Sequence, residues 1–399
     1  MSKLYDVIVV GGGPAGSASA AFLGAAGLHV LLLEADRHPR HHIGESLLPA
    51  SMPILQELGI SPDLLHARFQ TKYGARFYDP PTDRMATFEF DPSPGFTTPA
   101  FQVFREELDE LLIERAAAAG AEVLQKTPVE SIDEAAGRVT LADGRVLSAG
   151  MLVDATGRRA MIASKRGSRT GLDSFGRVGI YNYFKDLQPH DKDDPRYITM
   201  YLFPAGWVWL IPLADGRTSV GVVYREVPKL DPLTGKSKEE ALFQHAVDMM
   251  SRLRERLLSA VPTDPYRAIS DYSYAVEEKF GERFVLVGDA GGFLDPIFSS
   301  GVHLALSSAK RAGKGIVEKL RTGSDAGLRS YANYMNSGFR VFQAFVDRFY
   351  NRSLVENLFF MENKPPQMHA AITRILAGHV WDADNPVLKL LGIPPTACV

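Results

Sequence analysis

The chain has 399 residues, of which 45% are apolar and 23% charged, and its formal net charge is −3 at pH 7. This is the composition of a globular protein with a sizeable core, long enough for two or three domains of about 100–200 residues each. Because the basic residues form no long run, the sequence argues against a nucleic-acid partner.

The N-terminal sequence and the single cysteine bear on where the protein works. Residues 1–5 run directly into a strand pattern, without the charged, apolar and small-residue regions of a signal peptide. No apolar stretch approaches the roughly 20 residues that a membrane-spanning helix needs. Cys398 is the only cysteine, which excludes a disulfide within the chain and disfavours a cysteine nucleophile. We therefore expect a cytoplasmic protein without a membrane span.

The first predicted elements alternate between strand and helix. Residues 6–10 are an apolar, β-branched run that ends in glycines, small residues follow at 17–26, and a second apolar run covers 30–33. This pattern predicts a strand, a tight turn, a helix and a second strand. Farther along, the Pro-rich stretch 79–99 predicts a loop or an edge hairpin, and residues 105–119 predict a helix.

The middle of the chain is richer in strands. Residues 139–141 and 145–147 predict a strand pair joined by an Ala-Asp-Gly turn. Alternating apolar runs then predict a mostly antiparallel sheet with strands at 179–184, 197–203, 207–213 and 218–224.

The last third returns to the first pattern and then becomes helical. Residues 284–288 resemble the buried N-terminal strand, 301–320 predict a helix, and the chain from 325 onward is helical and rich in aromatic residues. We therefore predict an α/β fold: a Rossmann-like domain interrupted by an inserted, mostly antiparallel sheet domain. The predicted ranges are 1–78, 100–165 and 270–322 for the nucleotide-binding domain, 79–99 and 166–269 for the substrate-binding sheet, and 323–399 for a helical C-terminal region.

A glycine-rich motif directly follows the first strand. The segment GGGPAG, residues 11–16, fits G-x-G-x-x-G between a strand and a helix, and Glu34 ends the next strand. Such a motif binds the pyrophosphate of a dinucleotide at the helix N-terminus, while the acidic residue accepts hydrogen bonds from ribose. The alternative is a glycine-rich turn without a ligand. The candidate cofactor-binding residues here are Gly11, Gly13, Pro14, Ala15, Gly16 and Glu34.

A second motif favours FAD over NAD. The segment VGDAGGFLDP, residues 287–296, resembles the flavin-contacting segment of the FAD-dependent monooxygenase superfamily, in which the residue matching Asp289 binds the ribityl chain. The segment FREELDELL, residues 104–112, resembles the FAD-flanking helix of that superfamily, which adds Arg105 as a cofactor-binding candidate. Arg105 and Asp109 have the spacing of an ordinary surface pair as the alternative.

Four further segments resemble the flavin-dependent halogenases, which are built on the monooxygenase fold. GWVWLIP (206–212) is similar to their tryptophan-x-tryptophan-x-isoleucine-proline signature, and FLDPIFSSG (293–301) to the segment beside the flavin. TKYGA (71–75) places Lys72 where those enzymes keep their catalytic lysine, shortly after HHIGESLLPAS (41–51), which also matches. The resemblance covers roughly residues 1–350.

The resemblance implies a reaction in which FADH2, O2 and chloride or bromide produce hypohalous acid. It implies that Glu45, Ser46 and Gly301 contact FAD, and that halide lies near the backbone amides of Ser300 and Gly301. Lys72 would then hydrogen-bond the oxidant or form a haloamine and deliver the halogen to an electron-rich ring. A solvated surface lysine is the alternative for Lys72.

The two tryptophans of GWVWLIP fall on one face of the predicted strand. Trp207, Trp209 and Ile211 share that face, while the alternate residues are also apolar, so the strand is expected to be buried on both sides. The tryptophans are either core residues or a wall that separates flavin from substrate, and the two roles are compatible. The resemblance adds Pro296 and Phe298 to this wall.

Other candidates are weaker. His38, His41 and His42 lack a carboxylate or cysteine that would complete a metal site, so we expect no metal. The turn DATG, residues 154–157, departs from the direct Asp-Gly pair of related hydroxylases, which places NAD(P)H binding by this chain in doubt. The resemblance therefore implies a separate NAD(P)H-dependent flavin reductase as a partner.

Phe298 bears on the substrate. The halogenases that act on free tryptophan have a glutamate at this position, which assists halogenation of the ring, and they carry a longer C-terminal part. An apolar residue here favours a ring that needs no such assistance, such as a phenol or a pyrrole. That ring is either free or tethered to an acyl or peptidyl carrier protein. The alternatives are an FAD-dependent aromatic monooxygenase or hydroxylase, an FAD-dependent isoprenoid-chain reductase, and a flavin-binding protein without turnover.

Overall fold

The computed structural model describes residues 4–90, 99–172, 178–188, 194–230, 237–270 and 273–393. Cys398 and residues 91–98 of the predicted Pro-rich loop lie outside these ranges. Within them, no helix combines the length and the apolar character needed to cross a membrane. The cytoplasmic location stays a prediction.

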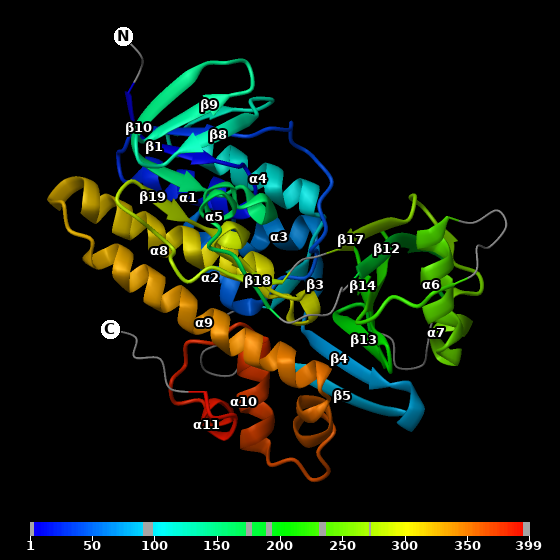
Figure 1. Ribbon diagram of the computed structural model, residues 1–399. Helices are drawn as coiled ribbons and strands as arrows, with labels where there is room; N and C mark the ends of the chain where they lie inside the picture. Colours follow the sequence, from blue (N-terminus) through cyan, green and yellow to red (C-terminus); the bar gives the residue numbers. More distant parts are fainter. Residues whose placement is uncertain are drawn as a thin grey trace.

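A seven-stranded sheet forms the centre of the nucleotide-binding part (Figure 1). Its order is β7 (Glu122–Leu124), β2 (Val30–Leu33), β1 (Leu4–Val10), β10 (Val146–Asp154), β9 (Arg138–Leu141) and β8 (Val129–Asp133), with β19 (Phe284–Leu286) beside β10. The strands β7, β2, β1, β10 and β19 are parallel, and β8 and β9 add an antiparallel hairpin. The carboxyl ends of the parallel strands meet at one edge, where open α/β sheets bind their ligands.

Helices cover this sheet because its strands are apolar on both faces. Val7 and Val9 of β1 face the core under α1 (Pro14–Ala25), α4 (Arg105–Ala118) and α8 (Ser300–Thr322). Ile8 and Val10 face a second cluster that includes α5 (Met161–Arg166) and the β8–β9 hairpin. The alternation places the same strand between two apolar layers, as parallel sheets require.

A second sheet of eight strands lies beside the first (Figure 1, green and blue). Its order is β16 (Val261–Pro262), β12 (Val178–Lys185), β15 (Thr218–Tyr224), β14 (Gly206–Pro212), β13 (Tyr197–Phe203), β4 (Gly74–Asp79) and β5 (Arg84–Glu89), with β17 (Arg267–Ser270) beside β12. All pairs are antiparallel except β13 with β4. The predicted antiparallel strands are therefore present.

The predicted start of the sheet domain at residue 79 is wrong. The whole of β4, from Gly74 onward, pairs with β13 and belongs to the antiparallel sheet, and the hairpin that it forms with β5 is the edge of that sheet. The pairing of Gly74 with Tyr197 joins segments far apart in the chain, which the local pattern could not indicate. The rest of the division into domains stays a prediction.

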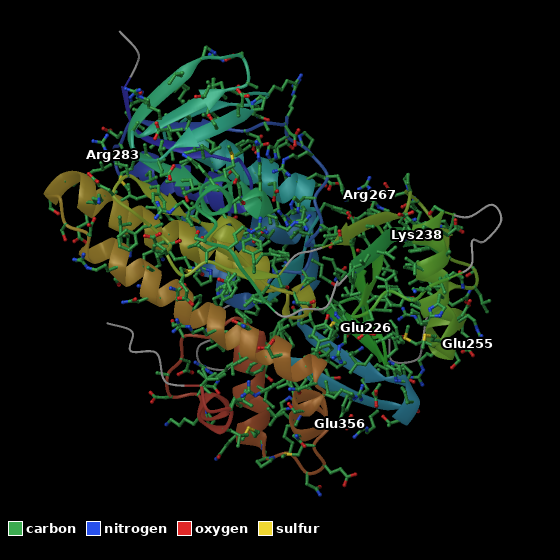
Figure 2. The ribbon with its side chains drawn as sticks, in the orientation of Figure 1. Glu226, Lys238, Glu255, Arg267, Arg283 and Glu356 are labelled. Atoms are coloured by element: carbon green, nitrogen blue, oxygen red, sulfur yellow. The ribbon has the colours of Figure 1, made fainter. Side chains whose placement is uncertain are left out.

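The outer face of the antiparallel sheet carries two helices that the strand pattern did not indicate. These are α6 (Lys238–Asp248) and α7 (Ser251–Leu257), whose apolar residues pack on Val208 and Leu210. Lys238 and Glu255 lie on the solvent side of these helices (Figure 2). The inner face of β14 is thereby left to point toward the nucleotide-binding part.

The C-terminal region is helical, as predicted. It consists of α9 (Ala326–Tyr350), a π-helical turn at Val355–Phe359, α10 (Pro366–Leu376) and α11 (Pro386–Leu390). Phe339, Phe342, Phe345 and Phe349 form the buried stripe of α9 that their spacing predicts.

Shorter elements connect these parts. They are α2 (Met52–Glu57), α3 (Pro62–Arg68), β3 (Gln70–Lys72), β6 (Ala100–Gln102), β11 (Thr170–Gly171), β18 (Tyr274–Ala275), β20 (Gly292–Phe293) and the 3-10 turns Pro49–Ser51, Pro80–Thr82, Gly157–Arg159, Gly288–Gly291 and Pro296–Phe298. The predicted α/β class, with a Rossmann-like part, a mostly antiparallel sheet and a helical C-terminal region, is confirmed.

Candidate functional site

A cavity of about 610 Å³ lies where the carboxyl edge of the parallel sheet meets the inner face of the antiparallel sheet. Most of the predicted site residues line it: Gly11, Gly13, Pro14, Ala15, Glu34, Glu45, Ser46, Arg105, Trp207, Trp209, Ile211, Asp289, Pro296 and Gly301. Four predicted residues are absent from this lining: Gly16, Lys72, Phe298 and Ser300.

The glycine turn after β1 leaves room for a ligand at the start of α1. Gly11 has φ +106°, and a Cβ on it would lie 2.3 Å from the carbonyl oxygen of Ala155. A Cβ on Gly16 would lie 1.8 Å from the carbonyl oxygen of Gly11, so this glycine permits the helix to pack on the turn. A Cβ on Gly13, in contrast, would meet only Arg40, at 3.8 Å, which leaves the helix N-terminus open to the cavity.

Glu34 is held in place by the turn itself. Its Oε2 accepts a 2.6 Å hydrogen bond from the Gly12 amide, and its Oε1 accepts one of 2.8 Å from the Asp36 amide. Arg40 lies 3.7 Å from Oε2. The carboxylate therefore lies at the end of β2 with a fixed orientation, beside the cavity that it lines.

Arg105 is a buried cation at the cavity. Its guanidinium donates to both carboxylate oxygens of Asp109, at 2.9 and 3.0 Å, and to the carbonyl oxygen of Ile43. Because the Arg105 side chain is only 5% exposed and that of Asp109 is 0% exposed, the alternative of a surface pair is wrong. The contact with Ile43 fixes the segment 41–46, which forms one side of the cavity.

Asp289 lies on the Gly288–Gly291 turn after β19 and faces the same cavity. Burial raises the pKa of its carboxyl to about 6, an effect that the positive charges of Arg105 and Arg158 oppose. No sequence motif indicated Arg158 and Arg159, which follow the turn after β10 and line the cavity together with Arg40. These cations favour an anionic ligand.

The residues present fit FAD. An open helix N-terminus, a carboxylate at the end of the second strand, nearby arginines and an aspartate on a turn from a distant strand are the groups that hold a pyrophosphate, a ribose and a polyhydroxylated chain. Asp154 is not available to a ligand, because its carboxylate accepts from the amides of Thr156 and Ile162.

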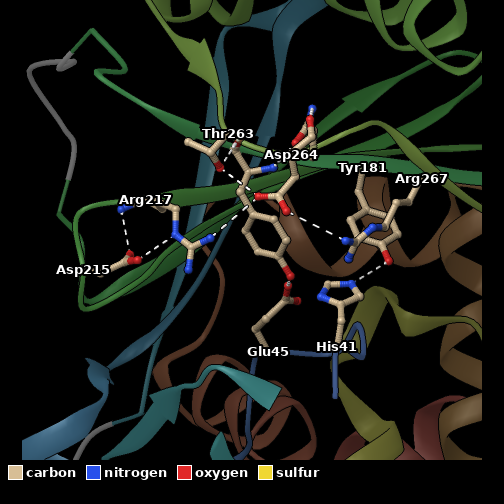
Figure 3. A network of polar contacts seen from close by, with 10 residues as sticks. His41, Glu45, Tyr181, Asp215, Arg217, Thr263, Asp264 and Arg267 are labelled. Atoms are coloured by element: carbon tan, nitrogen blue, oxygen red, sulfur yellow. Dashed lines mark hydrogen bonds and ion pairs between the residues drawn. The ribbon is translucent and has the colours of Figure 1, made fainter. Parts of the chain in front are cut away.

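The segment 41–46 is tied to the antiparallel sheet by a polar network (Figure 3). His41 Nε2 lies 3.1 Å from the Tyr181 hydroxyl, and Tyr183 donates a 2.8 Å hydrogen bond to Glu45 Oε1. Arg267, at the side of the sheet that faces the nucleotide-binding part (Figure 2), lies 3.8 Å from Asp264. No sequence motif indicated Tyr181 and Tyr183; the only signal for them was their alternation along a predicted strand.

The histidines of this segment contact backbone and hydroxyl groups. His42 Nδ1 lies 2.7 Å from the carbonyl oxygen of Ile43, and the charge of Arg105 lowers the pKa of His42 to about 4. Across the described ranges, no cluster of three or more His, Cys, Asp or Glu side chains is placed to hold a metal ion.

The tryptophan strand forms one wall of the cavity and is buried on both faces, as predicted. Trp207 is 2% and Trp209 8% exposed, and their rings lie 5.7 Å apart. Trp209 donates a hydrogen bond from Nε1 to Ser219. Gly221 on β15 makes this packing possible, because a Cβ there would lie 2.1 Å from the Trp209 ring.

Lys72 is buried next to the cavity rather than in it. It ends β3, which pairs with β6, and its side chain is 1% exposed, so the alternative of a solvated lysine is wrong. Its Nζ donates to Ser46 Oγ and to the Leu47 carbonyl oxygen, both at 2.8 Å. Burial lowers the pKa of the amine from 10.5 to about 7.

A serine pair connects Lys72 to the cavity. Ser299 donates a 3.0 Å hydrogen bond to Ser46 Oγ, and both serines line the cavity. Ser299, which we did not predict, has φ +56° and precedes the first residues of α8. The predicted halide residue Ser300 is 3% exposed and lies behind the lining, whereas Gly301 reaches it, so the cavity side of this turn is formed by Ser299 and Gly301.

Phe298 does not belong to the cavity wall. It is 4% exposed, and its ring lies 5.9 Å from those of Phe345 and Phe349 and 6.5 Å from that of Phe77. The 3-10 turn Pro296–Phe298 directs its side chain into the aromatic core under α9, while Pro296 faces the cavity.

Comparisons with known proteins show the family of this chain. Residues 4–346 match the family model of the FAD binding domain. The 1H-pyrrole-2-carbonyl-(peptidyl-carrier protein) chlorinase of Pseudomonas fluorescens is 30% identical over 94% of this chain and 90% of its own.

Solved structures of two flavoproteins are similar to this chain in fold and in sequence. A flavoprotein/dehydrogenase from Cytophaga hutchinsonii is 30% identical, with a TM-score of 0.88 over 99% of this chain and 97% of that one. The flavin-dependent brominase Bmp2 is 25% identical, with a TM-score of 0.86 over 98% of both chains. The chain therefore belongs to the FAD-binding domain family and, within it, to the flavin-dependent halogenases, and it is an oxidoreductase.

Proposed function

We propose that this halogenase transfers chlorine or bromine to an electron-rich phenolic or pyrrolic ring, either free or tethered to an acyl or peptidyl carrier protein. The observation that carries the proposal is the buried, weakly basic Lys72, which is linked through Ser46 to the cavity behind the tryptophan wall. The Pseudomonas relative, named as a pyrrolyl carrier-protein chlorinase, supports the choice of ring and of carrier.

The cofactor would be held by the glycine turn, Glu34, Arg105 and Asp289. Bound FADH2 supplies the oxidising chemistry, in which FADH2, O2, a halide ion and a proton give FAD, hypohalous acid and water. The open amides at the start of α8, next to Ser299 and Gly301, are the proposed place for the halide, because a helix N-terminus attracts anions.

The tryptophan wall would keep the substrate away from the cofactor, and Lys72 would bind the oxidant. Trp207 and Trp209 close one side of the cavity with buried rings, so that a large substrate does not reach the cofactor. A small oxidant formed at the cofactor therefore has to move to the substrate. Lys72 lies beyond the Ser46–Ser299 pair, where its amine would hydrogen-bond hypohalous acid or would react with it to form an N–halogen bond, with the displaced hydrogen and the hydroxide leaving as water.

The pH dependence of halogenation should report the lowered pKa of Lys72. A free lysine stays protonated up to about pH 10.5, but burial brings this pKa to about 7, so the neutral amine that accepts a halogen predominates above pH 7. We expect the rate of ring halogenation to rise with pH through about 7 and then level off. Rates measured in a pH series, with the supply of reduced FAD held constant, check this, and a rise centred near pH 10 would contradict it.

Reduction of the cofactor should require a second enzyme. The chain has one dinucleotide fingerprint, and the carboxylate of Asp154 is used by backbone amides. NADH or NADPH alone should therefore leave the absorbance of bound FAD unchanged over minutes, whereas an added flavin reductase should bleach it. Rapid bleaching by NAD(P)H alone would favour the hydroxylase alternative.

A substrate panel tests the proposed function directly. The panel consists of a phenol, a free pyrrole, a pyrrolyl group on a carrier protein and free tryptophan, each incubated with reductase, NADH and bromide. Mass spectrometry should detect a brominated product from at least one of the first three substrates and none from free tryptophan. The reason is that Phe298 stands where the tryptophan-acting halogenases are expected to have a glutamate, and its ring lies in the core, so position 298 presents no carboxylate to the cavity. Efficient turnover of tryptophan, with a KM in the micromolar range of about 1–1000 µM, would contradict the proposed substrate class.

A further inference from the structure

A hydrogen-bonded chain joins the two halogenase-like segments through the C-terminal region. Trp207 donates from Nε1 to the Tyr350 hydroxyl at 2.9 Å, and Tyr350 in turn donates to Asp295 Oδ2 at 2.8 Å. The other carboxylate oxygen of Asp295 accepts the amide hydrogen of Ile297 at 3.1 Å. The three side chains come from β14, from the end of α9 and from the turn before α8.

We infer that Tyr350 is a positioning residue, which fixes the tryptophan wall relative to the turn that begins α8; this rests on the proposed function and adds a residue to its machinery. Tyr350 is the last residue of α9, so the C-terminal region takes part in the site although Tyr350 itself does not line the cavity.

Burial makes this chain of contacts strong. Trp207 is 2% and Asp295 0% exposed, so each polar group pays a desolvation penalty unless a partner is present. The tyrosine hydroxyl serves both at once, because it accepts from the indole and donates to the carboxylate.

The place of Asp295 gives the contact its effect on the site. Asp295 caps the 3-10 turn Pro296–Phe298, after which Ser299 takes a left-handed conformation and α8 starts. A shift of Asp295 therefore moves the turn that presents Pro296, Ser299 and Gly301 to the cavity. A shift of Trp207 moves the tryptophan wall of the same cavity.

Tyr350→Phe removes the hydroxyl and keeps the ring. We expect the coupling ratio, which is halogenated product formed per reduced FAD oxidised, to fall by about fivefold or more, as the loss of a hydrogen bond implies. The excess reduced FAD reacts with O2 to give hydrogen peroxide, and the KM for halide rises while the rate of FAD oxidation stays the same.

The second readout needs no turnover. The chain has three tryptophans, so ¹⁵N-indole labelling gives three Nε1–H resonances. In Tyr350→Phe one of them should shift and exchange faster with water, and Asp295→Asn, which keeps a capping oxygen, should shift the same resonance.

Tyr224→Phe is the matched control. Its hydroxyl is buried and donates to a backbone oxygen, that of Leu242, but on the face of the sheet covered by α6. It should leave the coupling ratio and the indole spectrum at wild-type values. A wild-type coupling ratio or a wild-type indole spectrum in Tyr350→Phe would overturn the inference. If the wild-type enzyme halogenated none of the substrates, the proposed function would be overturned, and the indole spectrum would still test the chain of contacts.

Discussion

Replacing Lys72 with methionine is expected to stop ring halogenation while reduced FAD continues to be oxidised. We expect a loss of at least about 100-fold, the lower end of what a catalytic side chain contributes. Methionine has nearly the length of lysine, so it fills the buried site without leaving a large void. Product formation by mass spectrometry and O2 consumption, measured in the same reaction, separate the two steps.

Lys72→Arg should also be poor, because a guanidinium stays protonated and does not readily take up a halogen. Lys238→Met, on the exposed face of α6, is the control and should halogenate at the wild-type rate. Full halogenation by Lys72→Met would remove the lysine from the mechanism.

Lys72→Met should also change how stability depends on pH. In the wild type, the folded amine with its pKa of about 7 gives up a proton that the unfolded chain retains up to about pH 10.5, so the free energy of unfolding falls as the pH drops from 10.5 to 7 and levels off below. The methionine variant lacks this contribution. Denaturant unfolding at several pH values measures the difference between the two proteins.

Gly13→Val is expected to abolish FAD binding and leave the fold intact. A Cβ at this position would meet only Arg40, at 3.8 Å, so the folded chain has room for it. That same space lies at the N-terminus of α1, where the pyrophosphate has to approach the backbone. We expect the affinity of the variant for FAD to fall by at least about 100-fold. Equilibrium dialysis, with FAD quantified by its absorbance, measures this change.

Gly171→Val on β11 is the control, because nothing lies within 4 Å of its Cβ and it does not line the cavity. It should bind FAD like the wild type. If Gly13→Val bound FAD normally, the pyrophosphate would have to lie elsewhere.

The nucleotide-binding part could be predicted because its local requirements are strict. A Cβ on Gly11 or Gly16 would collide with backbone atoms, so only glycine fits, and the strand before them is apolar on both faces. Alternation likewise predicts β12 to β15, because one face of each packs on the cavity side and the other on α6 and α7.

What could not be predicted depends on contacts between distant segments. The pairing of β4 with β13, which moves the domain boundary to Gly74, is parallel and joins residues more than 100 positions apart. Lys72 lies in the three-residue strand β3, whose polar sequence gives no sign of burial. Its amine donates to the carbonyl oxygen of Leu47, which is 25 positions away in the chain. Phe298 and Ser299 are adjacent in the sequence, and only the geometry of the turn sends the first into the core and the second toward the cavity.

Labelling with ¹⁸O2 distinguishes halogen transfer from oxygen transfer. The protein is incubated with a flavin reductase, NADH, bromide and a reactive phenol under ¹⁸O2, and the phenol is analysed by mass spectrometry. We predict a product with the bromine isotope doublet and no ¹⁸O on the ring. A ring that carries ¹⁸O and no bromine would show that the protein transfers oxygen itself, and would contradict its assignment as a halogenase.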